Sequence, residues 1–558
     1  MIVRRNFLLT ALVLACFASG TGNAYASQGA WVQPSKVITS SEKASQYDAR
    51  VAVASDKTAI AVWLVDHPNQ STDYSDDTTS VMAAVRPPNG KFGKPFDLSG
   101  DAHGIWNLSI AAAASDITVL WQQTDNYSVI ARTRPAGGPF GPKVQLNDQG
   151  EAWEPYEPML AGGADGTTAV SWRQPRSTPS IVAQASIRPP GGVFGAPVDL
   201  MADQANATAN STALAVADDG AVVVAWQQYG QGIRVAERPA GGSFGSPVGL
   251  TGSQTGYWPV AGIAPDGTTT VAWTGSEGNT GGIFATTQQP GEDFPAASRV
   301  ARTEDPRESE MAVAGDGRIT IVWPEWVRGG DPDYGYFDDT ISKMVSWIPG
   351  QAKTVKRLGT ASGWNFGGAS VSGSADGSTT VVWPDRYGRD AGVKASTWTP
   401  GGEFSDPVRI STDLPDMVNV ATGPDGNAVA DWIAYRQSSV VVGTSSTVPA
   451  YCGRSSMTLG KVKRNPRNGT AWMLVKLGSR GKVSTLRSPW IKPMTTRAPK
   501  AGTYRVKVVP KGPARRLLRR TGWAEVKVGF RFDPTAVPCQ NVKASRQIVL
   551  IRQVRKSR

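Results

Sequence analysis

The sequence contains few side chains of the kinds that carry out covalent chemistry. His67 and His103 are its only histidines, and each lies in a loop-like context. A Ser-His-Asp catalytic triad is therefore not expected, because the triad needs a histidine between its nucleophile and its acid. Paired carboxylates such as Glu325 with Asp385 could hydrolyse a glycosidic bond, but the sequence gives no separation between them. Catalysis is the less favoured interpretation.

Two long insertions are acidic and aromatic. "LVDHPNQSTDYSDDTTS" follows Trp63, and "PEWVRGGDPDYGYFDDT" follows Trp323. Long loops on rigid scaffolds often carry function, and carboxylate oxygens are ligands for calcium. The candidate ligands are Asp331, Asp333, Asp338 and Asp339. Their spacing matches no known calcium loop, so we expect solvated acidic loops, no metal and no cofactor, with calcium as the alternative. No Cys/His cluster indicates zinc.

Two short phrases alternate along most of the chain. One reads "RPAGGPFGPKVQL", "RPPGGVFGAPVDL" and "RPAGGSFGSPVGL" at positions 134, 188 and 238. The other has the form of "APDGTTTVAW" and ends at Trp63, Trp121, Trp172, Trp226, Trp273, Trp323, Trp383 and Trp432. Asp-Gly between apolar runs is a hairpin signal, and Val271 and Trp273 at alternate positions share one strand face. Each repeat therefore predicts four antiparallel strands.

The repeat spacing predicts an all-β chain whose sheets stack radially as a β-propeller. Eight tryptophan strands are followed by only seven fourth strands. "WVQPSKVIT" from Trp31 to Thr39 reads as the missing fourth strand, so pairing it with the last repeat would close an eight-bladed ring of four-stranded blades. The sixth repeat is degenerate ("SWIPGQAKTVKRL"), which leaves a seven-bladed ring as the alternative.

Loops that lead into the first strand of each blade should gather around one mouth of a central channel. They carry the aromatic residues Tyr47, Trp106, Trp153, Tyr156, Tyr257, Trp258, Trp364 and Phe366. Thr208, Glu308 and Asp416 occupy the corresponding segments of the other repeats. Aromatic faces around a concave mouth suit sugar rings, so this set is the candidate ligand-binding site. The alternative is that each aromatic ring fills a gap between blades.

The first 26 residues read as an export signal, with Arg4 and Arg5 before an apolar run and "AYA" before Ser27. Sec and twin-arginine export both fit, and lipidation of Cys16 is a minority alternative. We expect a secreted or cell-wall-associated monomer. Only Cys452 and Cys539 then remain, and an exported pair of thiols is expected to form a disulfide.

The charge is distributed unevenly. Residues 451–558 carry 27 Lys and Arg against two acids, Glu525 and Asp533, leaving 31 bases and 44 acids to the rest of the chain. Alternation as in "YRVKVV" and "EVKVGF" predicts a small Ig-like β-sandwich over residues 450–558, with a short helix at "ARRLLRR". Such a charge should draw anionic wall polymers, acidic glycans or anionic lipids. Nucleic acid is not the expected partner.

This combination of repeats at 27–449 with a Lys/Arg-rich β-domain resembles secreted actinobacterial β-propeller proteins of no known activity. The resemblance covers nearly all of the mature chain. Sialidases share the architecture, and Arg173, Arg328 and Arg386 each follow a tryptophan strand, yet "SADGSTTVVW" departs from an Asp-box because its Gly comes too early. The favoured interpretation is a non-catalytic glycan-binding protein. The alternative is a secreted glycoside-acting enzyme, a sialidase-like hydrolase or a lyase.

Overall fold

The computed structural model describes residues 30–36, 46–67, 78–88, 90–100, 102, 104–124, 127–148, 153–177, 180–201, 208–252, 255–278, 280–304, 306–331, 335–362, 368–385, 391–413, 415, 417–434, 439–446, 457–477, 481–500, 502–534 and 542–553. The export signal over residues 1–26, Cys16, Cys452 and Cys539 lie outside these residues, so their predictions remain predictions.

The described chain is almost entirely β-structure. Up to Ser446 it forms eight four-stranded antiparallel sheets, and each sheet runs in the order first, tryptophan, third and fourth strand. The first strands are β2 (Gln46–Val53), β6 (Ile105–Ala113), β10 (Tyr156–Gly162), β14 (Ala209–Val216), β18 (Thr255–Ile263), β22 (Glu310–Val313), β26 (Ser370–Gly373) and β30 (Val418–Thr422). The tryptophan strands are β3 (Ala59–His67), β7 (Asp116–Gln123), β11 (Thr168–Ser177), β15 (Val222–Gln228), β19 (Thr269–Glu277), β23 (Ile319–Asp331), β27 (Thr379–Asp385) and β31 (Ala428–Ala434).

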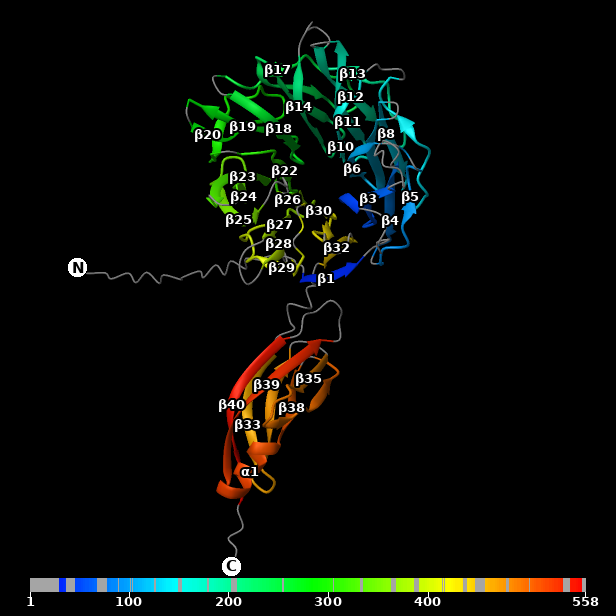
Figure 1. Ribbon diagram of the computed structural model, residues 1–558. Coiled ribbons are helices and arrows are strands. Elements are labelled where there is room, and N and C mark those ends of the chain that lie inside the picture. Colours follow the sequence, from blue (N-terminus) through cyan, green and yellow to red (C-terminus); the bar gives the residue numbers. More distant parts are fainter. Residues whose placement is uncertain are drawn as a thin grey trace, which may run out of the picture.

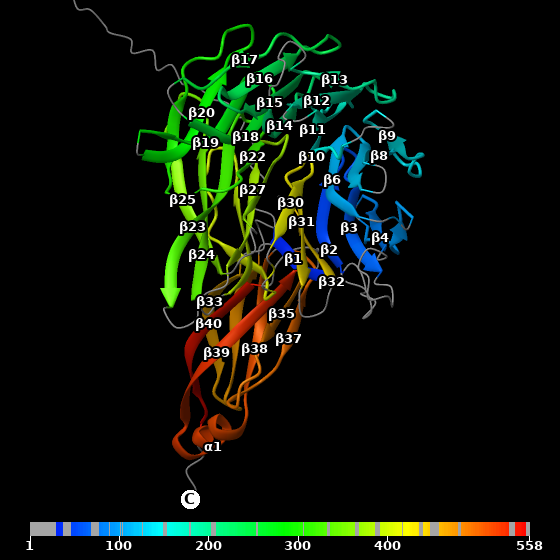
Figure 2. The same cartoon turned by 45° about the horizontal axis from the view of Figure 1, so that its top comes forward.

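The outer half of each sheet is less regular. The third strands are β4 (Thr78–Arg86), β8 (Ser128–Arg134), β12 (Ser180–Arg188), β16 (Gly232–Arg238), β20 (Thr280–Gln288), β24 (Gly335–Trp347), β28 (Gly392–Trp398) and β32 (Ser439–Ser446). The fourth strands are β5 (Phe96–Asp97), β9 (Val144–Gln145), β13 (Val198–Asp199), β17 (Val248–Gly249), β21 (Ser298–Arg302), β25 (Thr354–Ser362), β29 (Val408–Ser411) and β1 (Ala30–Lys36). The sixth sheet, predicted to be degenerate, has the longest hairpin, β23–β24 (Figure 2).

The Asp-Gly hairpins form where the repeats predict them, between the first and the tryptophan strands. In the turn before β19, Asp266 Oδ1 accepts a hydrogen bond from the Thr268 backbone N–H at 2.9 Å. The next residue, Gly267, has a φ of 85°, a conformation that costs glycine little because it has no Cβ. The same pairing of an Asp acceptor with a left-handed Gly recurs at Asp165–Gly166 and Asp376–Gly377. The side chain and the glycine together fix the register of each hairpin.

The eight repeat tryptophans hold neighbouring sheets together. Every one of them is less than 2% exposed. Trp226, for example, packs with Val182 and Ala183 of the preceding sheet, which is the role that the alternating pattern predicts. Truncating a buried tryptophan typically lowers the free energy of unfolding by about 3–5 kcal/mol, so each repeated Trp contributes strongly to the packing between neighbouring sheets.

The first strands contact one another in sequence order, and the last of them, β30, contacts β2. The eight sheets therefore form a closed ring with the first strands on its inner side (Figure 1). In the last sheet the fourth strand is β1, which pairs with β32. The predicted pairing of the N-terminal segment with the final repeat is thus present, over Ala30–Lys36.

Residues 457–553 form two further sheets. One has the order β33 (Met457–Asn465), β34 (Thr470–Leu477), β38 (Gly502–Pro510), β36 (Ile491–Lys492), and the other β37 (Thr495–Ala498), β35 (Gly481–Thr485), β39 (Trp523–Pro534), β40 (Val542–Ile551). Both sheets contribute to one core, which includes Val506, Phe530 and Leu550. The predicted short helix is present as α1 (Gly512–Thr521). As predicted, β39 buries Val526 and Phe530 while Lys527 and Arg531 face solvent. No helix among the described residues is long and apolar enough to span a membrane.

Candidate functional site

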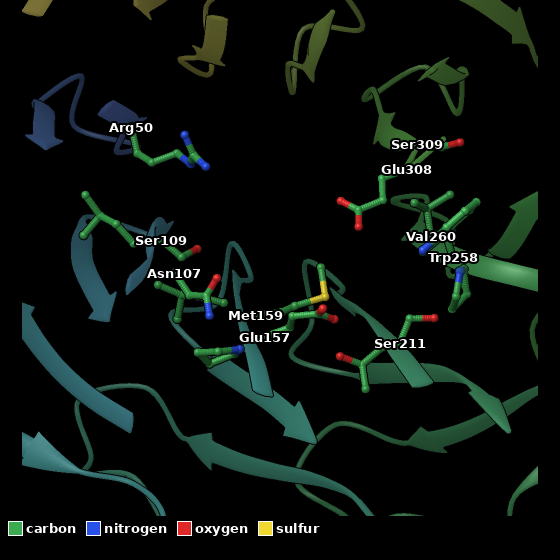
Figure 3. A pocket seen from close by; sticks show the side chains of 15 residues that line it. Arg50, Asn107, Ser109, Glu157, Met159, Ser211, Trp258, Val260, Glu308 and Ser309 are labelled. Atoms are coloured by element: carbon green, nitrogen blue, oxygen red, sulfur yellow. The ribbon is translucent and has the colours of Figure 1, made fainter. Parts of the chain in front are cut away.

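A cavity of about 500 Å³ lies on the inner side of the ring. Its wall comes from successive first strands and the residues just before them, so a single ligand would contact several sheets at once (Figure 3). The polar and aromatic side chains of the lining are Arg50, Asn107, Ser109, Glu157, Ser211, Thr212, Trp258, Glu308 and Ser309. Arg50 and Glu308 project into the cavity from different sides (Figure 3).

A repeated β-bulge turns these side chains toward the cavity. The pairing of the first strand with the tryptophan strand shifts register after Tyr47, Trp106, Tyr156 and Tyr257. The residue after each of these aromatics has a positive φ: Asp48 at 49°, Asn107 at 50°, Glu157 at 47° and Trp258 at 47°. Since a bulge adds one residue to a strand, it changes the direction of the side chain that follows. The aromatic side chain and the side chain of the next residue therefore point in different directions.

The left-handed conformation is not equally costly at these four positions. Asn and Asp adopt it readily, whereas Glu and Trp rarely do. Backbone strain of this kind, of order 1–3 kcal/mol per residue, persists only where the surrounding structure enforces it and is common at ligand sites. Among the four, the Trp258 bulge is the most unusual, which marks it as a candidate functional position.

Glu157, Glu308 and Arg173 form an electrostatic group at the cavity. Arg173 pairs with the Glu157 carboxylate at 2.9 Å, and its guanidinium lies 5.2 Å from the centre of the Tyr156 ring. Burial raises the pKa of Glu308, and the negative charge of Glu157 raises it further, while Arg173 partly opposes both. Glu157 is thus held in an ion pair, whereas the surroundings of Glu308 favour its protonated form.

A second charged group lies where the first and last sheets meet. Arg50 pairs with Asp48 at 2.7 Å. Asp431 on β31 is fully buried, and burial raises its pKa to about 7 despite the positive charge of Arg50. Between the sixth and seventh sheets, Glu310 on β22 is partly exposed to solvent, but desolvation raises the pKa of its carboxyl group to about 7. Val371 N–H and the Ser370 hydroxyl donate hydrogen bonds to Glu310 at 3.3 and 3.1 Å.

A second cavity, of about 490 Å³, adjoins Trp258. It is lined by Thr255, Tyr257, Trp258, Thr274, Ser276, Glu304 and Pro306 together with three glycines. The Tyr257 and Trp258 rings lie 6.2 Å apart and are tilted by 50°. Trp258 lines both cavities, so its indole forms part of two neighbouring walls, each with hydroxyl and carboxylate groups within it.

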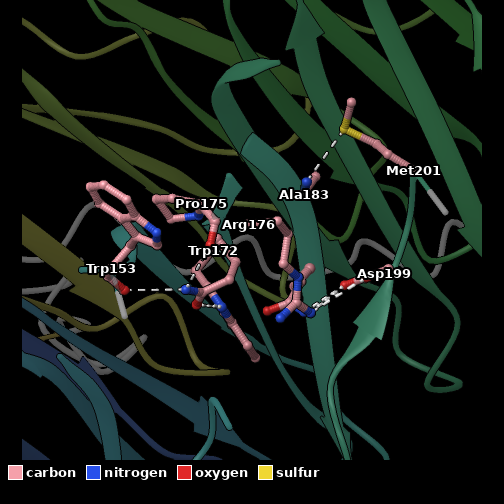
Figure 4. Close-up of polar contacts among 9 residues, drawn as sticks. Trp153, Trp172, Pro175, Arg176, Ala183, Asp199 and Met201 are labelled. Atoms are coloured by element: carbon pink, nitrogen blue, oxygen red, sulfur yellow. Dashed lines mark hydrogen bonds and ion pairs between the residues drawn. The ribbon is translucent and has the colours of Figure 1, made fainter. Parts of the chain in front are cut away.

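Most of the predicted aromatic residues lie outside the larger cavity. Trp106, Trp153, Tyr156 and Tyr257 are between 41% and 56% exposed, and none of them lines the larger cavity. Trp153 is anchored through its backbone carbonyl, which accepts a hydrogen bond from Gln174 Nε2 at 3.3 Å (Figure 4). Tyr47 is half-buried and donates a hydrogen bond to Asp66 at 2.8 Å.

Among the predicted aromatic residues that the structure describes, only Trp258 lines the larger cavity. Trp364, Phe366 and Asp416 lie outside the described residues. Glu308 lines the cavity as the repeat comparison suggested, whereas Arg50, Asn107 and Glu157 were not singled out by the sequence. An alignment of the repeats could have found the last two, because each directly follows an aromatic residue at the same distance from its hairpin.

The Glu325 and Asp385 carboxylates are engaged elsewhere. Lys343 Nζ lies 2.6 Å from Glu325, and Lys394 Nζ lies 2.6 Å from Asp385. Burial opposes ionisation of Glu325, but hydrogen bonds from Lys343 and Thr303 outweigh it and lower its pKa. Glu325 and Asp385 are in different sheets, and neither lines the larger cavity, so they are not part of this candidate site.

The remaining chemical candidates are limited. His67 Nε2 lies 3.0 Å from the Ser80 hydroxyl, at the end of β3. The side chains of Arg328, Asp331, Asp338 and Asp339, and the whole of His103, Asp333 and Arg386, lie outside the described part of the chain. Within the described part, no group of three or more His, Cys, Asp or Glu side chains is arranged to hold a metal ion.

No family model matches the chain, and no curated protein matches it. Among solved structures, a lectin from Burkholderia pseudomallei is 11% identical, with 66% of this chain and 99% of the lectin covered and a TM-score of 0.42. A polysaccharide lyase that acts on ulvan is 11% identical over 67% of this chain and 94% of its own, with a TM-score of 0.38. An α-L-arabinofuranosidase of Fusarium graminearum is 12% identical over 74% and 97%, with a TM-score of 0.33. These similarities are distant, and they carry no argument about the function of this chain.

Proposed function

We propose that this chain is a secreted, non-catalytic binding protein whose central cavity and mouth take a glycan. Its eight sheets would be the blades of an eight-bladed β-propeller, followed by an Ig-like β-sandwich. We further propose that residues 1–26 direct export and that the basic C-terminal domain associates with an anionic cell surface. The protein would thus hold a soluble or wall-borne sugar chain at the cell surface to which its C-terminal domain binds.

Trp258 is the observation that carries the glycan proposal. Its indole lines both cavities, and its backbone is held in a conformation that tryptophan rarely adopts. The aliphatic C–H face of a sugar ring stacks on an aromatic face, and a site that positions such a face in advance loses little entropy on binding. The same bulge carries Asp48, Asn107 and Glu157 in three other sheets, so the fold does not require a tryptophan at this strained position, and we assign the choice of tryptophan to ligand recognition.

The polar lining complements this apolar face. Asn107, Ser211 and Glu157 offer amide, hydroxyl and carboxylate groups on neighbouring first strands. Each can exchange hydrogen bonds with sugar hydroxyls, while Trp258 supplies the stacking surface. Because the larger cavity measures about 500 Å³, it is in the size range of sites for small ligands and short oligosaccharides.

A glycan array with the mature chain, residues 27–558, tests the proposal. We expect binding to a restricted set of related glycans, competed by the free sugar. Absence of binding to any glycan, or binding that follows only the negative charge of the glycan, would contradict a role for the cavity. The array is run at high salt, because screening suppresses contacts made by the basic domain alone.

One observation favours an enzyme as the second candidate. Glu157 and Glu308 are two carboxylates on the wall of one cavity, and the pKa of Glu308 is raised by burial and by Glu157. Glycoside hydrolases use such a pair, with one carboxyl group protonated as the acid. Release of reducing ends or unsaturated products from the glycans that bind, lost in both Glu157→Gln and Glu308→Gln, would establish this candidate over the first.

A further inference from the structure

One end of the C-terminal domain combines arginines with exposed aromatic side chains. Helix α1 buries Ala514 and Leu518 against the domain core, and its outward face carries Arg515, Arg516, Arg519 and Arg520. Arg516, Arg519 and Arg520 follow Arg515 by one, four and five residues, so the four side chains form a single face of the helix. No ion pair involving these four arginines is found among the described residues.

Other basic residues lie next to this helix. Arg464 is near the end of β33, and Arg467 is in the turn between β33 and β34, whose Gly469 lies against Leu518 of α1 and Arg552. The backbone N–H of Arg552 donates a hydrogen bond to the carbonyl of Gly522, directly after the helix. These contacts place arginines from the helix and from two other segments at the end of the domain where α1 lies (Figure 1).

Large apolar side chains are exposed at the same end. Trp523, which follows the helix, is 53% exposed and lies opposite Ile551, which is 40% exposed. Trp490 is 40% exposed, and its carbonyl accepts a hydrogen bond from the backbone N–H of Lys511 at the start of the helix. We call this surface the arginine–tryptophan tip: α1, the β33–β34 turn, Trp490, Trp523, Ile551 and Arg552.

We infer that the arginine–tryptophan tip docks on the surface of a lipid bilayer that contains anionic lipids. The inference rests on the surface association proposed above. We assign that association to the arginine–tryptophan tip and its partner to a bilayer with anionic lipids. Arginine side chains reach lipid phosphates, and tryptophan prefers the headgroup level of a membrane, where its ring is partly buried and its N–H stays hydrated.

The exposed apolar residues favour a bilayer over a soluble polyanion. A phosphate polymer would be held by charge alone and would gain little from Trp490, Trp523 or Ile551. A bilayer interface accepts both the charges and the apolar rings, as it does for amphipathic surface-binding helices. The only acids in residues 451–558 are Glu525 and Asp533, and Asp533 is already paired with Arg531 at 2.6 Å. The tip therefore keeps its positive field.

Co-sedimentation of the full mature chain with vesicles tests this inference. One set of vesicles contains phosphatidylcholine alone, and the other contains phosphatidylcholine and phosphatidylglycerol in equal parts. We expect binding to the second set only. Changing Arg515, Arg516, Arg519 and Arg520 together to Gln should weaken binding by more than about a hundredfold, since a base at an anionic surface contributes roughly fivefold.

A matched variant controls for net charge. Lys476, Lys482, Arg497 and Lys500 are exposed at the opposite end of the same two sheets, and changing all four to Gln removes the same charge. This variant should retain most of the vesicle binding. Equal loss in the two variants would overturn the assignment to the tip, because it would show that only the total charge matters.

Variants of the exposed tryptophans distinguish a bilayer from a polyanion as the partner. Trp490→Ser with Trp523→Ser should weaken binding to anionic vesicles by about tenfold or more, equivalent to about 1.4 kcal/mol, and leave binding to soluble polyphosphate unchanged. Vesicle binding that is unaffected by these changes would overturn the inference in favour of a polyanion. Glycan binding by the ring is measured on the same variants, so failure of one proposal is distinguishable from failure of the other.

Discussion

Trp31 of β1 lies directly opposite Ser445 of β32, so the first described strand pairs with the last strand of the repeat array. Every other sheet of the ring is built from one continuous stretch of chain, and only this one combines its two ends. The half-buried Trp31 ring packs against a core that includes Trp432 and Val441. Closure of the ring therefore depends on both the backbone ladder and one aromatic contact.

Removing β1 should destabilise the whole ring. A chain that begins at residue 37 leaves β32 as an unpaired edge and uncovers the core around Trp432. We expect a fall in the melting temperature of several degrees, or aggregation, measured by scanning calorimetry. A chain that begins at residue 28 keeps β1 and is the matched control. Identical melting of the two chains would contradict closure by this strand.

Asp431 predicts a pH dependence of stability with a definite sign. Its pKa is raised by burial to about 7, whereas an unfolded Asp has a pKa of about 3.9. The native state therefore holds a proton that the unfolded chain releases. The stability contributed by the protonated group is complete below about pH 4 and is lost as the pH rises through about 7.

The Asp431→Asn variant should therefore be more stable than the wild type at pH 8, by about 1–4 kcal/mol, and nearly equal to it below about pH 4, where Asp431 is protonated in both states. Other repeats carry Ala, Ser, Val or Leu at this position, so the site does not require a carboxylate. Asp406 is exposed in the loop between β28 and β29, and Asp406→Asn serves as the control. Denaturant titrations at the two pH values measure the difference. A pH-independent effect would refute the burial of an ionisable Asp431.

The Cys452–Cys539 disulfide remains a prediction, because both residues lie outside the described chain. Thiol labelling of the denatured, unreduced mature protein should modify neither cysteine. Closing a loop of this length contributes up to about 4 kcal/mol in the chain-entropy model. Reduction should accordingly lower the melting temperature of the C-terminal domain, and two labelled cysteines in the unreduced protein would disprove the bond.

The repeat phrases predicted most of the architecture because hairpin turns and buried strand faces depend on residues that are close together in the sequence. Asp-Gly pairs fix the hairpins, the alternating Val and Trp fix the buried faces, and a fourth strand without a repeat before it pointed to β1. The sequence did not predict that several fourth strands pair over only two residues, as at Val248–Gly249. Pairing in these outer strands depends on the twist and packing of the neighbouring sheet rather than on local pattern.

The candidate site was less accessible to sequence reasoning. Aromatic residues such as Trp106 and Tyr156 stand out in the sequence, but a bulge turns the next residue, Asn107 or Glu157, toward the cavity. A bulge depends on the register between two strands, which a single repeat does not reveal. Arg50 is likewise drawn into the site by ring closure, which brings β2 next to the last sheet.

Calorimetric titration of the best glycan from the array, with the wild type and with Trp258→Ala, is the most direct test of glycan recognition by the ring. The variant keeps the backbone site but loses the indole, so we predict that affinity falls by at least about tenfold, equivalent to about 1.4 kcal/mol, with an unchanged melting temperature. Trp523→Ala, which removes an exposed tryptophan from the C-terminal domain, should bind the glycan as the wild type does. Wild-type affinity in a folded Trp258→Ala variant would contradict the account.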